Sequence, residues 1–111
     1  MDEPKKVLTI HIGKNDIFEW TMGKGKDVLM PELLVGCEEL LYNDVDEIHC
    51  LRVETQIRGN QKAFDFSVKK DGVSETLTKI MDWGLETENY EICQRVKELF
   101  DYLKKVDFTY D

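Results

Sequence analysis

Two amphipathic segments that follow each other near the end of the chain constrain its fold more than any other feature. Residues 73–105 predict two short helices that fold back on each other, with a corner at residues 87–89. Apolar residues recur every three or four positions in both segments, so they share one face of each helix. They are Leu77, Ile80, Met81, Gly84 and Leu85 in the first segment, and Ile92, Cys93, Val96, Leu99, Phe100 and Leu103 in the second. Ser74 is the expected amino-terminal cap of the hairpin, because its hydroxyl can accept a hydrogen bond from a free backbone amide.

Four segments in the rest of the chain show the alternation of apolar and polar residues that is typical of β-strands. The strands are expected at residues 7–13, 17–22, 48–57 and 63–69. The first two would form a hairpin, and a helix is expected to begin near Pro31, because proline fits the first helical turn. The order strand, strand, helix, strand, strand, helix, helix predicts a single two-layer α+β domain over residues 1–111. It would contain a four-stranded, mostly antiparallel sheet with helices on one face.

Smaller features refine this expectation. Residues 23–27 read as a flexible basic loop, and Gly36 either weakens its helix or lets a neighbour pack closely. Within residues 48–57, Ile48 and Cys50 are apolar at even-numbered positions, whereas Leu51, Val53 and Ile57 are apolar at odd-numbered ones. This change of strand face indicates a β-bulge near Cys50 or burial of both faces at that end. The tail, residues 106–111, alternates as a strand does and could dock on a sheet edge or fray.

The net charge of −8 limits the choice of partner. Phosphate contacts need clustered Lys and Arg, so we expect no direct nucleic-acid binding, and the same repulsion argues against anionic membranes. A protein with a basic surface fits better. The chain has no apolar segment of the ~20 residues that a membrane helix needs, and its start lacks the apolar run of a signal peptide. Together with three widely spaced cysteines, Cys37, Cys50 and Cys93, this predicts a cytoplasmic protein with free thiols.

The densest run of charge lies between residues 38 and 47, which contain five acids and no base. We call these five residues the acidic rim: Glu38, Glu39, Asp44, Asp46 and Glu47. They match no calcium-loop pattern. The rim is either a solvated surface or an anionic patch that meets a basic partner and imitates the spacing of phosphates.

Residues that could support catalysis or hold a metal are sparse. His11 and His49 are the only histidines, and the sequence has no Cys-x-x-Cys or His-x-x-x-His pair around which a zinc site could form. Two cysteines lie on apolar helix faces, where burial disfavours the reactive thiolate, and Cys50 is a weak candidate. The glycines and lysines of residues 23–26 lack the spacing of a phosphate-binding loop. We expect no metal, no cofactor and no enzymatic activity.

Two aromatic residues flank the predicted corner. Trp83 lies at the border of the apolar face of its helix, and we expect it in the core. The alternative is exposure beside Tyr90, where the two rings would anchor a partner. Trp83, Tyr90 and Glu91 therefore join the acidic rim as candidate interaction residues.

From Met81 onward the hairpin resembles the UVR motif of the excision-repair B and C proteins. The matching residues are Met81, Leu85, Tyr90, Glu91, Cys93, Val96, Lys97 and Phe100. In that family the corner aromatic packs between the helices, small residues let the helices approach, and the hairpin mediates protein–protein contact. Leu85 and Cys93 stand where the family usually has alanine, and Gln94 replaces a second small residue. The resemblance implies docking if it is functional, and a self-packed helical layer if it is only geometric.

Three functions follow, in order of preference. The first is a non-enzymatic interaction module that binds another protein through the helical hairpin and the acidic rim. The second is an acidic inhibitor that imitates nucleic acid and blocks a nucleic-acid-handling protein, of viral or mobile-element type. The third is an enzyme whose pocket would hold His11 or His49 near carboxylates. Strand edges and the aromatic tail could also form a symmetric homodimer, and the sequence leaves the oligomeric state open.

Overall fold

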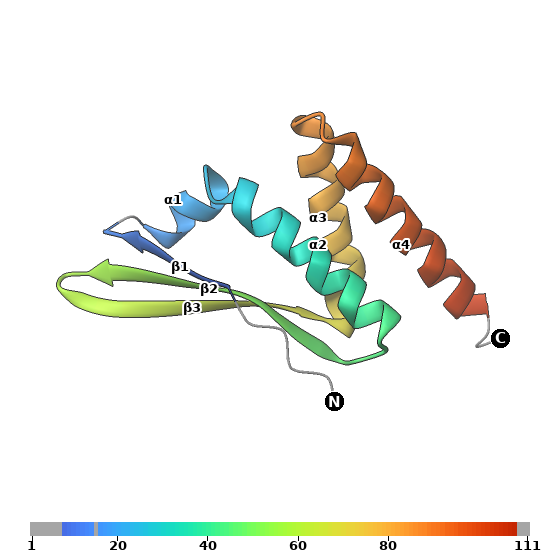
Figure 1. The fold of residues 1–111 in the computed structure, drawn as a ribbon, viewed down its shortest axis with the longest axis horizontal. Coiled ribbons are helices and arrows are strands. Elements are labelled where there is room, and N and C mark those ends of the chain that lie inside the picture. Colours follow the sequence, from blue (N-terminus) through green and yellow to red (C-terminus); the bar gives the residue numbers. More distant parts are fainter. Residues whose placement is uncertain (1–7, 15, 109–111) are drawn as a thin grey trace.

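The computed structural model of the chain describes residues 8–14 and 16–108. Its elements follow in the order β1 (Leu8–Gly13), α1 (Ile17–Met22), α2 (Lys26–Tyr42), β2 (Glu47–Ile57), β3 (Asn60–Lys69), η1 (Lys70–Gly72), α3 (Val73–Glu86) and α4 (Tyr90–Phe108). The strands form one layer, and the helices lie on one side of it (Figure 1). The α+β class that the sequence predicts is confirmed.

The sheet differs from the prediction in the number and direction of its strands. The described strands form a three-stranded sheet in the order β1-β2-β3, with β1 parallel to β2 and β2 antiparallel to β3. The prediction of a four-stranded, mostly antiparallel sheet is therefore wrong. Helices connect β1 to β2, so the chain crosses over the sheet and returns in the same direction, which a tight hairpin turn cannot achieve.

The error lies at residues 17–22, which form helix α1 instead of a second strand. The Asp16 carboxylate caps this helix by accepting hydrogen bonds from the amides of Phe18 at 2.8 Å and Glu19 at 3.3 Å. Phe18 and Met22 fit a strand face because they are an even number of positions apart. They are also four positions apart and therefore share a helix face. Over such a short segment, alternation does not distinguish the two structures.

The connection between α1 and α2 is a tight corner, although the sequence predicted a flexible loop. The Trp20 carbonyl accepts hydrogen bonds from the amides of Gly23 at 3.3 Å and Gly25 at 2.7 Å. A Cβ atom at Gly25 would lie 2.3 Å from Trp20 Cδ2, so a larger residue would displace the ring. Helix α2 begins at Lys26 and contains Pro31, so the predicted start near Pro31 is wrong.

Strands β2 and β3 pair along their length with one irregularity. Their register shifts between His49 and Leu51, which confirms the bulge predicted near Cys50. Cys50 and Leu51 are both buried, because the extra residue turns two consecutive side chains toward the core. Arg58 and Gly59 form the two-residue turn with φ angles of 52° and 79°, as hairpins of this kind require.

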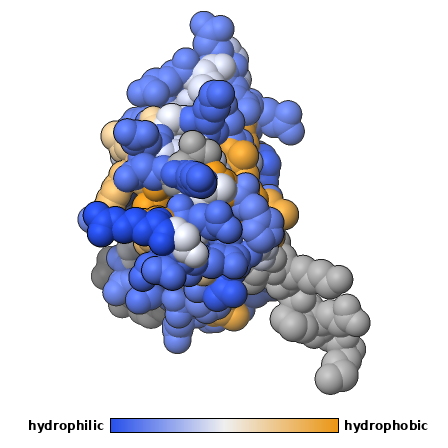
Figure 2. Space-filling model, turned by 90° about the vertical axis from the view of Figure 1, so that its left-hand side faces the viewer, coloured by the Kyte–Doolittle hydropathy of each residue, from blue (hydrophilic) through white to orange (hydrophobic). Residues whose placement is uncertain are grey.

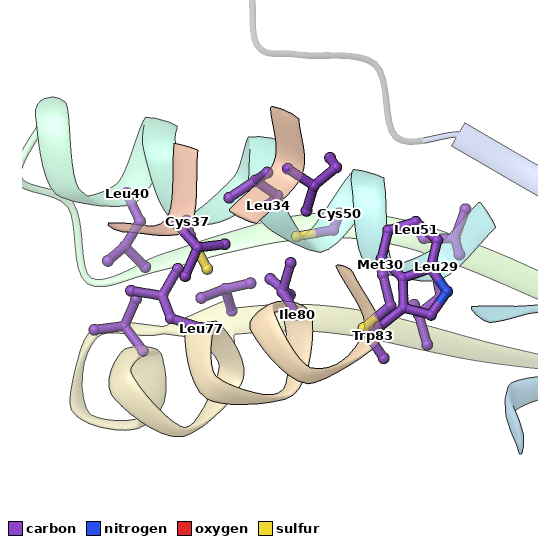
Figure 3. Packing of buried hydrophobic residues seen from close by; sticks show 14 of the residues in the cluster. Leu29, Met30, Leu34, Cys37, Leu40, Cys50, Leu51, Leu77, Ile80 and Trp83 are labelled. Carbon is purple, nitrogen blue, oxygen red and sulfur yellow. The ribbon is translucent and has the colours of Figure 1, made fainter. Parts of the chain in front are cut away.

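The core lies between the sheet and α2 and continues between α2 and the α3–α4 hairpin. Figure 3 shows apolar side chains of α2, β2 and α3 packed against one another. Helix α2 approaches the sheet closely at Gly36, where a Cβ atom would lie only 2.3 Å from Cys50 Sγ. The expectation that Gly36 permits close packing is therefore confirmed.

The hairpin predicted at residues 73–105 is present as α3 and α4. Leu77, Ile80, Val96 and Leu99 are fully buried, so the predicted apolar faces do pack inward. Helix α3 begins at Val73, after Gly72 in the cap position, so the predicted cap at Ser74 is wrong. The strand-like tail is also wrong for residues 106–108, which continue α4, while residues 109–111 lie outside the described residues.

Candidate functional site

Tertiary contacts bring bases to the acidic rim, although its own sequence contains none. Arg95 of α4 pairs with Glu38 of α2 through two hydrogen bonds, from Nε to Oε2 at 3.0 Å and from Nη2 to Oε1 at 2.5 Å. The hydrogen bonds that the Arg95 guanidinium donates to Glu38 raise the pKa of Arg95 above its ordinary value. Asp44, after α2, pairs with Lys70 of η1. These two carboxylates therefore link elements of the same molecule.

The other rim residues are also close to lysines or to the protein interior. Glu47 lies directly opposite Lys69 in the β2–β3 register. The Lys70 amide donates a hydrogen bond to the Asp46 carbonyl at 2.9 Å. Asp46 and Glu47 line a shallow hollow together with both lysines, and Glu39 is half-buried on α2. The folded rim is thus a surface of mixed charge.

A second group of acids lies at the corner between α3 and α4. Residues 82–91 contain four acids and no base. Two large apolar side chains lie among these acids, Leu85 at 55% exposure and Tyr90 at 65%. We call the following six exposed residues the acidic corner: Asp82, Leu85, Glu86, Glu88, Tyr90 and Glu91. Arg95, one turn further along α4, is already paired with Glu38. Exposed apolar side chains framed by charges are typical of interaction surfaces.

Backbone hydrogen bonds define the shape of the acidic corner. The Glu88 amide donates to the Leu85 carbonyl at 3.2 Å, and the Asn89 amide donates to the Gly84 carbonyl at 2.8 Å. Glu88 has a φ of 57°, the left-handed conformation in which helices commonly end at glycine. A charged side chain therefore occupies a position where glycine would be less strained.

Trp83 belongs to the core and not to the acidic corner. It is only 7% exposed and lies beside Leu29 and Met30 of α2 (Figure 3), and its Nε1–H donates to Asp27 Oδ1 at 3.3 Å. The expected burial is confirmed, so Trp83 and Tyr90 do not form a joint exposed anchor.

Helices α3 and α4 approach each other closely near the corner that joins them. A Cβ atom at Gly84 would lie 2.8 Å from Cys93 Sγ, so these two positions bring the helices together. Leu85, which stands at a small-residue position of the family, is exposed, and so is Tyr90. Tyr90, the aromatic residue at the corner, thus faces solvent.

Both histidines lie on the sheet face away from the helices. His11 Nδ1 is 3.3 Å from Glu54 Oε1, and His49 Nδ1 is 2.8 Å from Ser67 Oγ. Each histidine lines its own shallow hollow. No group of three or more His, Cys, Asp or Glu side chains that could hold a metal ion occurs in the described part of the chain.

The ionisable groups with shifted pKa values have structural explanations. Arg52 hydrogen-bonds to Asp65 at 2.9 Å across the sheet, which lowers the pKa of the Asp65 carboxyl below its ordinary value. Burial, followed by the nearby Cys50 and Glu38, raises the pKa of the Cys37 thiol to about 12. Cys37 therefore stays protonated near neutral pH, which a nucleophilic cysteine could not do.

An exposed apolar surface on α1 was missed by the sequence prediction, which placed its residues on a strand. Phe18 and Met22 are 78% and 74% exposed. Met22 borders a groove of about 500 Å³ between α2 and α3, with Leu29 and Trp83 in its walls. On the side of the molecule that Figure 2 shows, hydrophobic areas lie among mostly hydrophilic residues. The capping Asp16, followed by apolar residues four positions apart, is the sequence signal that could have identified this helix face.

The chain matches no protein-family model, no curated protein and no solved structure. Within residues 8–14 and 16–108, no helix combines the length and the apolar character needed to cross a membrane.

Proposed function

We propose that the chain is a non-enzymatic protein-binding module that docks through its acidic corner onto a basic, partly apolar surface of a partner protein. The observation that carries this proposal is the exposure of Leu85 and Tyr90 among four carboxylates on a hydrogen-bonded helical turn. Apolar side chains at the centre of an interface contribute most of the affinity once water is excluded from them. The surrounding charges would select and orient the partner.

Docking is assigned to the acidic corner in preference to the acidic rim. Glu38 and Asp44 already have basic partners within the molecule. A basic residue of another protein would have to displace Arg95 from Glu38, and the freed guanidinium would then be half-buried without its partner. The proposed binding surface is therefore the helical hairpin alone, without the acidic rim.

An acidic inhibitor that imitates nucleic acid stays the alternative function. Such a protein needs carboxylates that are not already paired, and the four acids of the acidic corner form no salt bridge in the described part of the chain. An enzyme is less favoured, since the pairs of His11 with Glu54 and of His49 with Ser67 lie in shallow, separate hollows. We expect a cytoplasmic location, which agrees with the free thiols of the three cysteines.

The test compares two exposed tyrosines on the helical layer. Tyr90 at the acidic corner is 65% exposed, and Tyr42 at the end of α2 is 56% exposed and contacts the ring of Tyr102 edge-on. A photo-crosslinking amino acid at position 90 should give one discrete product with a partner in the native cell, and the same amino acid at position 42 should not.

The crosslinked partner is then identified by mass spectrometry and purified. With this partner, Tyr90→Ala should weaken the Kd by about 10–100-fold, as loss of a central anchor does, and Tyr42→Ala should leave it unchanged. Equal crosslinking from both positions, or a Kd that does not respond to Tyr90→Ala, would contradict the proposal.

A further inference from the structure

We draw no further inference here: the strongest candidate, the apolar groove between α2 and α3 that the exposed Met22 of α1 borders, is lined by lysines as well as carboxylates, and nothing in the structure shows what covers it.

Discussion

The acidic rim and the acidic corner look alike in sequence and differ in the folded protein. Residues 38–47 contain five acids and no base, and residues 82–91 contain four acids and no base. The fold brings Lys69, Lys70 and Arg95 to the rim from β3, η1 and α4. In the described part of the chain, no ion pair involves an acid of the corner.

This difference separates charges that stabilise the fold from charges that are available to a partner. A carboxylate paired with a half-buried arginine contributes to stability and is costly to recruit for binding. An exposed carboxylate on a turn contributes little to stability and can select a partner. Substitutions in the two regions should therefore have different consequences.

The largest expected effect concerns the thiol beneath the rim. Cys37 precedes Glu38, and its pKa is raised from 9.0 to about 12, first by burial and then by Cys50 and Glu38. Above pH 9 the unfolded chain releases this proton while the folded protein keeps it, so stability is intact below pH 9 and falls as the pH rises toward 12. By about pH 11 the loss should be on the order of 3 kcal/mol.

Urea unfolding between about pH 8 and about pH 11 measures this loss. Cys37→Ala should flatten the alkaline decline, because the raised pKa disappears with the thiol. Cys93→Ala removes the half-buried thiol beneath the acidic corner and leaves Cys37 in place. In this variant the free energy of unfolding should decline with pH as it does in the wild type. Equal slopes for Cys37→Ala and the wild type would show that the buried thiol is not responsible.

The close helix contacts beneath the two regions should also differ in how well they tolerate replacement of glycine by alanine. A Cβ atom at Gly36 would lie 2.3 Å from the buried Cys50 sulfur, and one at Gly84 would lie 2.8 Å from the half-buried Cys93 sulfur. Gly36→Ala should lower the free energy of unfolding by about 2–3 kcal/mol through overpacking. Gly84→Ala should cost about 1 kcal/mol, because the Cys93 side chain has more room to move. A Cβ atom added at Gly72 would have no heavy atom within 4 Å, so Gly72→Ala is the matched control.

The free energies of unfolding of both glycine variants are measured by urea unfolding, with one shared m-value for the dependence on urea concentration. Cys93→Ala should rescue Gly84→Ala, since it removes the atom in contact. A double variant as unstable as Gly84→Ala alone would mean that the contact is not the cause.

Neutralising one carboxylate in each region compares the charges directly. Glu38→Gln should lower the free energy of unfolding by about 1 kcal/mol, because it weakens two charge-assisted hydrogen bonds to Arg95 in a partly exposed site. Glu91→Gln at the acidic corner should change it by less than about 0.5 kcal/mol. Thermal unfolding at low and high salt checks both values. A loss at Glu91 as large as that at Glu38 would remove the distinction between rim and corner.

The smallest expected effect is a gain in stability at the two turns. Asp44 and Glu88 have φ angles of 52° and 57°, where glycine is less strained. Glu88→Gly should therefore stabilise the fold by about 0.5–1 kcal/mol while it removes one charge from the acidic corner. Asp44→Gly should gain less, because aspartate tolerates this conformation better and its pair with Lys70 is lost. Unfolding midpoints that fall in both variants would contradict the strain argument.

Local pattern was sufficient for the features that depend on neighbouring residues. The helical hairpin and the bulge near Cys50 follow from the spacing of apolar residues, which sets the face of each helix or strand. The prediction is wrong at residues 17–22, because a segment of six residues fits both periods and only the Asp16 cap distinguishes the helix from a strand. With residues 17–22 taken as a strand, a mostly antiparallel sheet was expected. The helical crossover instead makes β1 parallel to β2.

Contacts between distant residues were needed for the candidate site. Glu38 and Arg95 are 57 positions apart, so no local pattern could show that this rim charge is neutralised. The groove beside the acidic corner likewise joins residues from α1, α2, β3 and α3. Periodicity reports which side chains face a common core, whereas the charge left on a surface depends on which residues the fold brings within a few ångströms of one another.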